Sequence, residues 1–455
     1  MTPRFAVVGH PNKGKSSIVS TLVEMSEIPI SNTPGSTYKS QSYAMRIQNQ
    51  TLYNLIDTPG FQRPHIVLSW LQSHCQTADA RPRAISKFLS EHRDHPDYVN
   101  ECELLKPLVD GAGILYVVDG SKPYGSEYEA EMEILRWTGR PRMALINLIG
   151  KDSYIEEWQA ALDQYFGLVR IFDAFHADLN KRIALLISFG ELNQEWQPEL
   201  QKAIQIIDQD WSQRKSKSAA VIAKLLFETL TFKLNQKIDN DSQAATITEN
   251  LNHHLKDRIR NAEHQARKAV EYIYRYQHID RKEPGIDLIN LDLFSSESMQ
   301  LFGLSRKKLI ATGAASGATA GLGVDVLLGG TSLLLGSSIG AVVGGVSAAI
   351  GSSHIGKLKK YGMTLAKRSI NVGPIKDPNL PWALLSRALL HHKLISERNH
   401  ALRNSLSLEA KDSQNIADSI SEDFRSDLNE QFNSIRRKFN NYKLDKLKEL
   451  IESNL

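Results

Sequence analysis

A glycine-rich loop near the start of the sequence combines the residue types that bind the phosphates of a nucleotide. Residues 9–16 read Gly-His-Pro-Asn-Lys-Gly-Lys-Ser, after the apolar run 5–8 and before a segment with helical apolar periodicity. Glycines let backbone N–H groups approach phosphate oxygens, Lys15 supplies positive charge, and the Ser16 hydroxyl can ligate Mg²⁺. The pattern predicts a strand, a phosphate-binding loop and a helix, in that order. The residues expected to bind nucleotide here are Gly9, Asn12, Lys13, Gly14, Lys15, Ser16 and Ser17.

Two later segments have the order expected of loops that sense the last phosphate of a triphosphate. An apolar stretch ends in Asp57-Thr-Pro-Gly60, and Pro34-Gly-Ser-Thr37 precedes it. We expect Asp57 to hold Mg²⁺, the Gly60 N–H to contact the γ-phosphate, and the Thr37 hydroxyl to reach Mg²⁺ while that phosphate is present. The predicted catalytic residues are therefore Lys15, Thr37 and Gly60, and the predicted metal ligands are Ser16, Thr37 and Asp57.

These segments resemble the Era/MnmE-like branch of the bacterial P-loop GTPases (TRAFAC class), over about the first 180 residues. The shared patterns are G-x-P-N-x-G-K-S, P-G-[ST]-T and D-T-P-G, in that order. The resemblance implies binding of GTP and GDP with Mg²⁺, hydrolysis of GTP, and a K⁺ ion held by Asn12; an Asn12 that only stabilises the loop is the alternative. Phe61 stands where Ras-like enzymes have the glutamine that orients water, so we expect slow or K⁺-stimulated hydrolysis.

The segment that would select the base departs from the family pattern. The family has N-K-x-D after a strand, whereas this chain reads Asn147-Leu-Ile-Gly150-Lys-Asp152. Asn147 matches the pattern, Gly150 stands at the position of the guanine-binding aspartate, and Asp152 comes two residues later. The later stretch 173–175, Asp-Ala-Phe, is a poor copy of the S-A-K base loop. Asn147 and Asp152 are the candidates for base binding, and both guanine and adenine stay open.

Composition and charge place the chain among ordinary globular proteins. It has 455 residues, 41% hydrophobic and 23% charged, which leaves room for two or three domains. A net charge of +4 is small for this length, so nucleic acid is not expected as a partner. Cys75 and Cys102 do not have the spacing of a metal site and fit a reducing compartment. No signal peptide is expected before the first strand, which favours a cytoplasmic location.

Beyond about residue 190 the alternation of strands and helices gives way to helical periodicity. We predict an α/β P-loop NTPase domain with a mostly parallel sheet over 1–190, followed by an all-α domain. Its parts are a helical region at 191–305, a Gly-rich apolar helical hairpin with basic flanks at 306–360, and a C-terminal helical region at 361–455. This part resembles an uncharacterised extension of some Era-like GTPases, which implies no activity of its own.

Apolar residues in the last region recur at steps of three and four, which is typical of a helix seam. Such a seam packs either within the chain or in a homodimer. His391 and His392, in the preceding helical segment, are expected at the surface. The seam residues are Phe424, Leu428, Phe432, Ile435, Phe439 and Tyr442.

Small residues recur at every fourth position between residues 309 and 356, where Asp325 is the one formally charged residue. This period is typical of helices that pack closely in a membrane, and each arm of about 20 residues matches the hydrocarbon core. The pattern favours a glycine-zipper hairpin with both ends at the cytoplasmic face; a buried hairpin of a soluble domain is the alternative. We therefore predict a GTP-dependent switch that engages a membrane or membrane protein. The alternatives are a soluble Era-like GTPase acting on RNA or ribosome assembly, and a dynamin-like membrane-remodelling GTPase.

Overall fold

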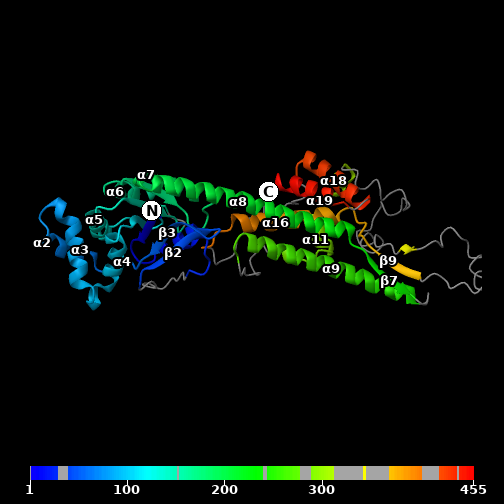
Figure 1. Cartoon of the computed structure of the whole chain (residues 1–455), viewed down its shortest axis with the longest axis horizontal. Coiled ribbons are helices and arrows are strands. Elements are labelled where there is room, and N and C mark those ends of the chain that lie inside the picture. The colour runs from blue at the N-terminus through cyan, green and yellow to red at the C-terminus, as the bar shows by residue number, and fades with distance from the viewer. Residues whose placement is uncertain are drawn as a thin grey trace, which may run out of the picture. The chain divides into compact units, whose positions relative to one another are not determined.

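The computed structural model describes residues 2–28, 39–150, 153–238, 243–276, 288–311, 342–344, 368–401, 420–437 and 440–455. The chain divides into two compact units (Figure 1). The first comprises Met1–Ser212 with Glu397–Arg403, and the second comprises Gln213–Ser396 with Asn404–Leu455. The predicted site residues Thr37 and Asp152 lie outside the described residues, as does nearly all of the Gly-rich stretch.

A six-stranded sheet forms the centre of the first unit. Its strands are β1 (Arg4–Val8), β2 (Gln41–Ile47), β3 (Gln50–Asp57), β4 (Gly113–Asp119), β5 (Arg142–Asn147) and β6 (Leu168–Phe172). The order is β2-β3-β1-β4-β5-β6; β2 runs antiparallel to β3, and all other neighbours are parallel. The predicted mostly parallel sheet is confirmed. Because the parallel strands end at one edge, the loops after β1, β3, β4, β5 and β6 come together there, where α/β proteins bind ligands.

Helices cover both faces of this sheet because successive strand residues point to opposite sides. In β4, Leu115 and Val117 pack into one core, and Ile114, Tyr116 and Val118 pack into the other. The first core holds α1 (Lys15–Val23), α7 (Leu179–Leu192) and the start of α8 (Gln197–Thr231). The second holds α2 (Pro64–His74), α3 (Arg81–His92), α4 (Val99–Val109), α5 (Glu129–Trp137) and α6 (Ile155–Leu162). Short 3-10 turns occupy Ala78–Ala80, Pro96–Tyr98 and Ser126–Tyr128.

Helices dominate the second unit, as predicted. After the end of α8, the described helices are α9 (Ala244–Ile273), α11 (Ser296–Phe302), α12 (Arg306–Ala311), α16 (Leu380–Glu397), α18 (Glu422–Arg437) and α19 (Asn441–Glu452). They share one apolar core that includes Leu226, Leu255 and Trp382. A small antiparallel sheet of order β7-β9-β8 accompanies them, with β7 (Leu234–Ile238), β8 (Val342–Gly344) and β9 (Arg368–Val372). The strand β8 lies within the stretch predicted as a helical hairpin, so that prediction is wrong at residues 342–344. Sequence periodicity did not predict this sheet, because each strand is short and pairs with a distant segment.

The predicted helix seam packs within the second unit over most of its length. Phe424, Leu428, Phe432 and Ile435 of α18 are buried in its core. The prediction is wrong for Tyr442, which is 70% exposed. The Asn440 side chain accepts a hydrogen bond from the Tyr442 N–H and caps a new helix, α19, so the seam does not continue in register. Phe439 lies outside the described residues.

The surface position predicted for two neighbouring histidines of α16 is also wrong. His391 and His392 are both buried. The Nε2 atom of His391 lies 3.2 Å from the Glu271 carboxylate, and that of His392 lies 2.9 Å from the Tyr274 hydroxyl. Burial lowers the pKa of His392 to about 4, because a charged imidazole is poorly solvated there. Partners on α9 and in the turn after it therefore allow these polar rings to be buried.

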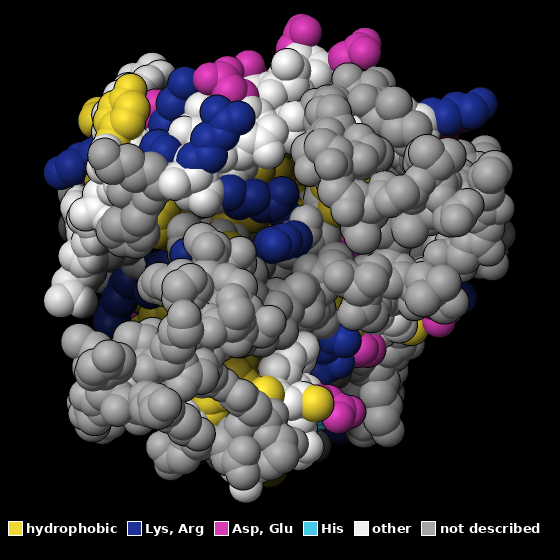
Figure 2. Space-filling model, turned by 90° about the vertical axis from the view of Figure 1, so that its right-hand side faces the viewer, with side chains coloured by type: hydrophobic (Ala, Val, Ile, Leu, Met, Phe, Trp, Pro, Cys, Tyr) yellow, Lys and Arg dark blue, Asp and Glu magenta, His cyan; other side chains and the backbone are white. Residues whose placement is uncertain are grey.

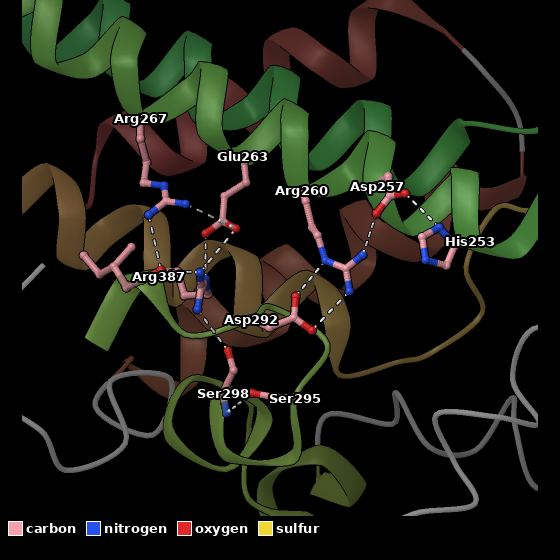
Figure 3. A network of polar contacts seen from close by, with 10 residues as sticks. His253, Asp257, Arg260, Glu263, Arg267, Asp292, Ser295, Ser298 and Arg387 are labelled. Carbon is pink, nitrogen blue, oxygen red and sulfur yellow. Dashed lines mark hydrogen bonds and ion pairs between the residues drawn. The ribbon is translucent and has the colours of Figure 1, made fainter. Parts of the chain in front are cut away.

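A buried ion pair connects three helices of the second unit (Figure 3). Arg387 of α16 is 1% exposed and donates from Nε to the Glu263 carboxylate of α9 at 2.6 Å. Its Nη1 donates to the Ser298 hydroxyl of α11 at 3.0 Å. A second Arg–carboxylate pair, between Arg260 and Asp292, is half exposed. The buried pair is the more consequential one, because each charge has lost its water and depends on its partner.

Candidate nucleotide-binding site

The loop that joins β1 to α1 has a backbone conformation that requires glycine at two positions. Gly9 has φ +141, and a Cβ atom there would lie 2.4 Å from the Val117 carbonyl oxygen. Gly14 has φ +82, in the left-handed region that favours glycine, and Asn12 also has a positive φ of 61. The predicted order of strand, tight loop and helix is confirmed. The two glycines leave a cradle of backbone groups at the N-terminus of α1.

A buried lysine places positive charge inside this loop. Lys15 is the first residue of α1 and is 7% exposed. Its Nζ donates to the carbonyl oxygens of Gly9 at 3.2 Å and His10 at 3.0 Å. Burial lowers the pKa of Lys15, while the nearby Asp57 carboxylate acts in the opposite direction. The ammonium group is thus held by the loop itself, where a phosphate anion would be attracted.

Two predicted metal ligands lie side by side. The Ser16 hydroxyl donates to Oδ2 of Asp57 at 2.7 Å, and Asp57 is the last residue of β3. The next residue, Thr58, is fixed by a 2.8 Å hydrogen bond from its hydroxyl to the Val7 carbonyl of β1. A hydroxyl and a carboxylate are oxygen ligands of the kind that Mg²⁺ prefers. The pair therefore fits the metal that the sequence implies.

The Asp-Thr-Pro-Gly turn packs directly against the phosphate-binding loop. A Cβ atom on Gly60 would lie 2.6 Å from both the backbone nitrogen and Cδ of Pro11. The following residue, Phe61, is fully buried in the core beneath α2 to α6. Its ring points into protein and has no hydrogen-bonding group, which agrees with the expectation that it does not orient water.

A buried carboxylate beneath the loop was missed by sequence reasoning. Glu131 of α5 is fully buried, and its Oε1 lies 2.8 Å from Nδ1 of His10 in the phosphate-binding loop. Its Oε2 accepts a hydrogen bond from the Tyr116 hydroxyl of β4 at 2.9 Å. This network holds the His10 side chain on the sheet. Glu131 lies among the buried apolar residues of α5, and this position alone does not mark it as functional.

Helix α4 supplies two further carboxylates that hold the flanks of the site. Oε1 of Glu101 accepts the backbone N–H groups of Gln62 at 2.9 Å and Arg63 at 2.7 Å, just after the Asp-Thr-Pro-Gly turn. Oε2 of Glu103 accepts the Ser40 N–H at 3.0 Å, and the Ser40 hydroxyl donates to the Glu103 carbonyl. One helix therefore binds the segment after Gly60 and the residue that precedes β2.

On the base side, one predicted residue connects two loops. Asn147 ends β5 and is fully buried. Its Nδ2 donates to the Lys13 carbonyl at 3.2 Å, and its Oδ1 accepts the Ala174 N–H at 3.3 Å. Asn147 thereby ties the phosphate-binding loop to the loop that follows β6. In that loop Asp173 is occupied by the N–H groups of Phe175 and His176.

Comparisons with known proteins divide the chain into two consecutive parts. Residues 4–148 match the family described as "50S ribosome-binding GTPase", and residues 159–452, well over half of the chain, match "Domain of unknown function (DUF3482)". The GTPase Der of Mycoplasma pneumoniae is 28% identical over 157 residues, which are 33% of this chain and 28% of that protein. The GTPase Der of Desulfitobacterium hafniense is 44% identical over 62 residues, 14% of each chain. The chain thus spans less than a third of the length of these relatives.

Solved structures of GTPases also match the chain. Era of Aquifex aeolicus, bound to GDP and AlF4−, has 15% identity and a TM-score of 0.30, and the match covers 60% of this chain and 89% of that one. With the site geometry, the matches to the GTPase family and to Der confirm the predicted P-loop GTPase domain of Era-like type. The chain belongs to the family described as a domain of unknown function (DUF3482), and it carries this GTPase domain ahead of that region.

Proposed function

We propose that the first unit binds GTP and hydrolyses it to GDP with Mg²⁺, as a molecular switch. The observation that carries the proposal is the 2.7 Å contact between Ser16 and Asp57 beside the buried Lys15. These groups come from separate motifs, and the fold brings them to one edge of the sheet. A phosphate-binding loop with charge and oxygen ligands at that edge is the arrangement that nucleoside triphosphates require.

Each predicted residue has a distinct role in this proposal. Lys15 neutralises the β- and γ-phosphates, and the backbone of Gly9, Lys13, Gly14 and Ser17 lines the phosphates. Ser16, Asp57 and Thr37 hold Mg²⁺, which neutralises the charge on the phosphate oxygens when bound. The Gly60 N–H contacts the γ-phosphate, Asn147 and Asp152 serve the base, and Asn12 holds K⁺.

Replacing the loop lysine tests the site. Lys15→Ala removes the buried charge, so we expect GTP affinity to fall roughly 10- to 100-fold, which corresponds to about 1.4–2.8 kcal/mol. Lys87→Ala, which changes an exposed lysine of α3, is the matched control and should bind GTP like the natural chain. Fluorescent-nucleotide titration gives the affinities, with ATP as competitor to establish base preference. Unchanged GTP affinity in a folded Lys15→Ala chain would reject the site. Equal rates of GTP hydrolysis by the natural chain in K⁺ and in Na⁺ would reject the proposed K⁺ role of Asn12.

We further propose that the Gly-rich stretch engages a membrane or a membrane protein from the cytoplasmic side. Its small residues, which recur at period four, support this. The basic residues at 306–308 and 357–360 that flank this stretch suit an anionic membrane surface. On the face shown in Figure 2, Lys and Arg side chains are interspersed with Asp, Glu and hydrophobic side chains. No helix among the residues that the structure describes is long and apolar enough to cross a bilayer.

Fractionation distinguishes this proposal from its alternatives. We expect the full-length chain in the membrane pellet after salt and carbonate washes, and a variant lacking 309–356 in the supernatant with nucleotide binding retained. A full-length chain in the supernatant would contradict membrane engagement. Recovery of the chain with ribosomal particles would favour action on RNA or ribosomes. The expectation that nucleic acid is not a partner finds no support, since residues 4–148 match a family described as ribosome-binding GTPases. Nucleotide-dependent assembly on liposomes would favour the dynamin-like alternative, and a C-terminal homodimer stays a prediction.

A further inference from the structure

The loop after β6 is held in place by several groups. Its Ala174 N–H donates to Asn147, which also binds the phosphate-binding loop. The Ala174 carbonyl accepts a 2.8 Å hydrogen bond from the buried Thr21 hydroxyl of α1. The loop follows a parallel strand at its carboxyl end, on the side of the sheet away from β3. In the proposed nucleotide site, this loop borders the base.

A segment more than 200 residues later in the chain also binds this loop. Residues 397–403 begin at the last residue of α16 and belong to the first unit. Asn399 is 3% exposed, and its Nδ2 donates to the Phe175 carbonyl at 2.8 Å. Next to it, Nδ1 of the buried His400 lies 2.8 Å from the Ser26 hydroxyl, just beyond α1. Both side chains thus contact elements that carry the nucleotide site.

We propose that Asn399 is a positioning residue for the base-binding half of the nucleotide site, with His400 as its anchor at Ser26, just beyond α1. This inference rests on the proposed GTP binding. Ala174 is fixed by Thr21 and Asn147, but the neighbouring Phe175 carbonyl receives its side-chain donor from Asn399. A buried side chain that donates to a loop carbonyl restricts the loop to one conformation. A residue of the DUF3482 region therefore helps to determine how tightly the GTPase domain holds a base.

The test is a substitution that removes one donor and keeps the side-chain size. Asn399→Asp presents carboxylate oxygens to the Phe175 carbonyl and cannot donate. We expect the KM for GTP to rise about tenfold and GDP to dissociate about tenfold faster, while kcat at saturating GTP stays within about twofold. Competition by inorganic triphosphate, which has no base, should not change. Asn399→Gln keeps an amide donor and should recover part of the affinity.

Glu397→Gln, an exposed change in the same segment, is the matched control. An Asn399→Asp chain with the KM of the natural protein would overturn the inference. Equal weakening of GTP and inorganic triphosphate would also overturn it, because the defect would then not be confined to the base. If the natural chain binds no GTP, the proposed function fails; if the natural chain binds GTP and the variant matches it, this inference alone fails.

Discussion

Gly60 has no room for a side chain, so its substitution tests directly whether the Asp-Thr-Pro-Gly turn senses the third phosphate in the proposed switch. A methyl group there would collide with the backbone nitrogen and ring of Pro11, neither of which is the movable end of a side chain. Substitution must therefore separate the Asp-Thr-Pro-Gly turn from the phosphate-binding loop. In the proposed site, the turn would then carry its N–H away from the γ-phosphate, while the loop and Lys15 would remain in place.

For Gly60→Ala we expect GTP hydrolysis to slow tenfold or more, about 1.4 kcal/mol of lost transition-state stabilisation. GDP affinity should stay within about threefold, because GDP has no γ-phosphate. Single-turnover hydrolysis and GDP titration measure the two effects. Gly167→Ala is the matched control, since a Cβ atom at Gly167 would meet nothing within 4 Å. Hydrolysis at the natural rate in Gly60→Ala would show that the turn does not sense the third phosphate.

At the residue scale, the sequence indicated which candidate residues lie together where they belong to one motif or follow a recognisable strand. Gly9, Lys15 and Ser16 share one motif, and Asp57 follows a recognisable strand, so spacing alone indicated that they lie near one another. Their roles in binding and hydrolysis stay predictions. Glu131, Glu101 and Asn399 act through contacts between segments that only folding brings together. A single acidic or amide side chain carries no spacing pattern, which is why the sequence did not indicate them. The buried His391 and His392 were missed for the same reason, since their partners lie outside α16.

At the scale of elements, the buried pair between Arg387 and Glu263 joins two helices of the second unit. Arg387→Met removes one charge and leaves the other buried without its main partner, so we expect a loss of about 3–5 kcal/mol in the free energy of unfolding. Urea unfolding followed by circular dichroism measures it. The double variant Arg387→Met with Glu263→Leu removes both charges and should recover much of the loss. A loss below about 1 kcal/mol in Arg387→Met would mean that the pair contributes little to the packing of these helices.

Elements were predictable where periodicity is strong. The strands of the first unit are continuous apolar runs, because parallel strands are buried on both faces, and the mostly parallel sheet followed from them. Periodicity indicated where helices and strands occur better than it indicated the residues at which they begin and end. Asn440 caps a new helix inside an apparent seam, and β7 and β9 are too short to stand out within a helical region. Capping and strand pairing are decided by local hydrogen bonds and by distant partners.

On the scale of the whole molecule, the change from strands to helices indicated two kinds of structure. The sequence limits at residues 190, 305 and 360 stay predictions. No pattern in the sequence indicated that residues 397–403 return to the first unit. The contacts of this segment include those of Asn399 and His400 with residues far away in the sequence, and such contacts leave no periodic trace.

Because the first unit is built from two separate stretches of the chain, a newly synthesised copy completes this unit late. Residues 213–396, which amount to 184 residues, are synthesised between the two parts of that unit. At roughly 5–20 residues per second, a ribosome needs on the order of ten to forty seconds to add them. Throughout that interval the β6 loop is already made, whereas Asn399 is not. If Asn399 positions this loop as proposed, a nascent copy would bind nucleotide more weakly until residues 397–403 have been made.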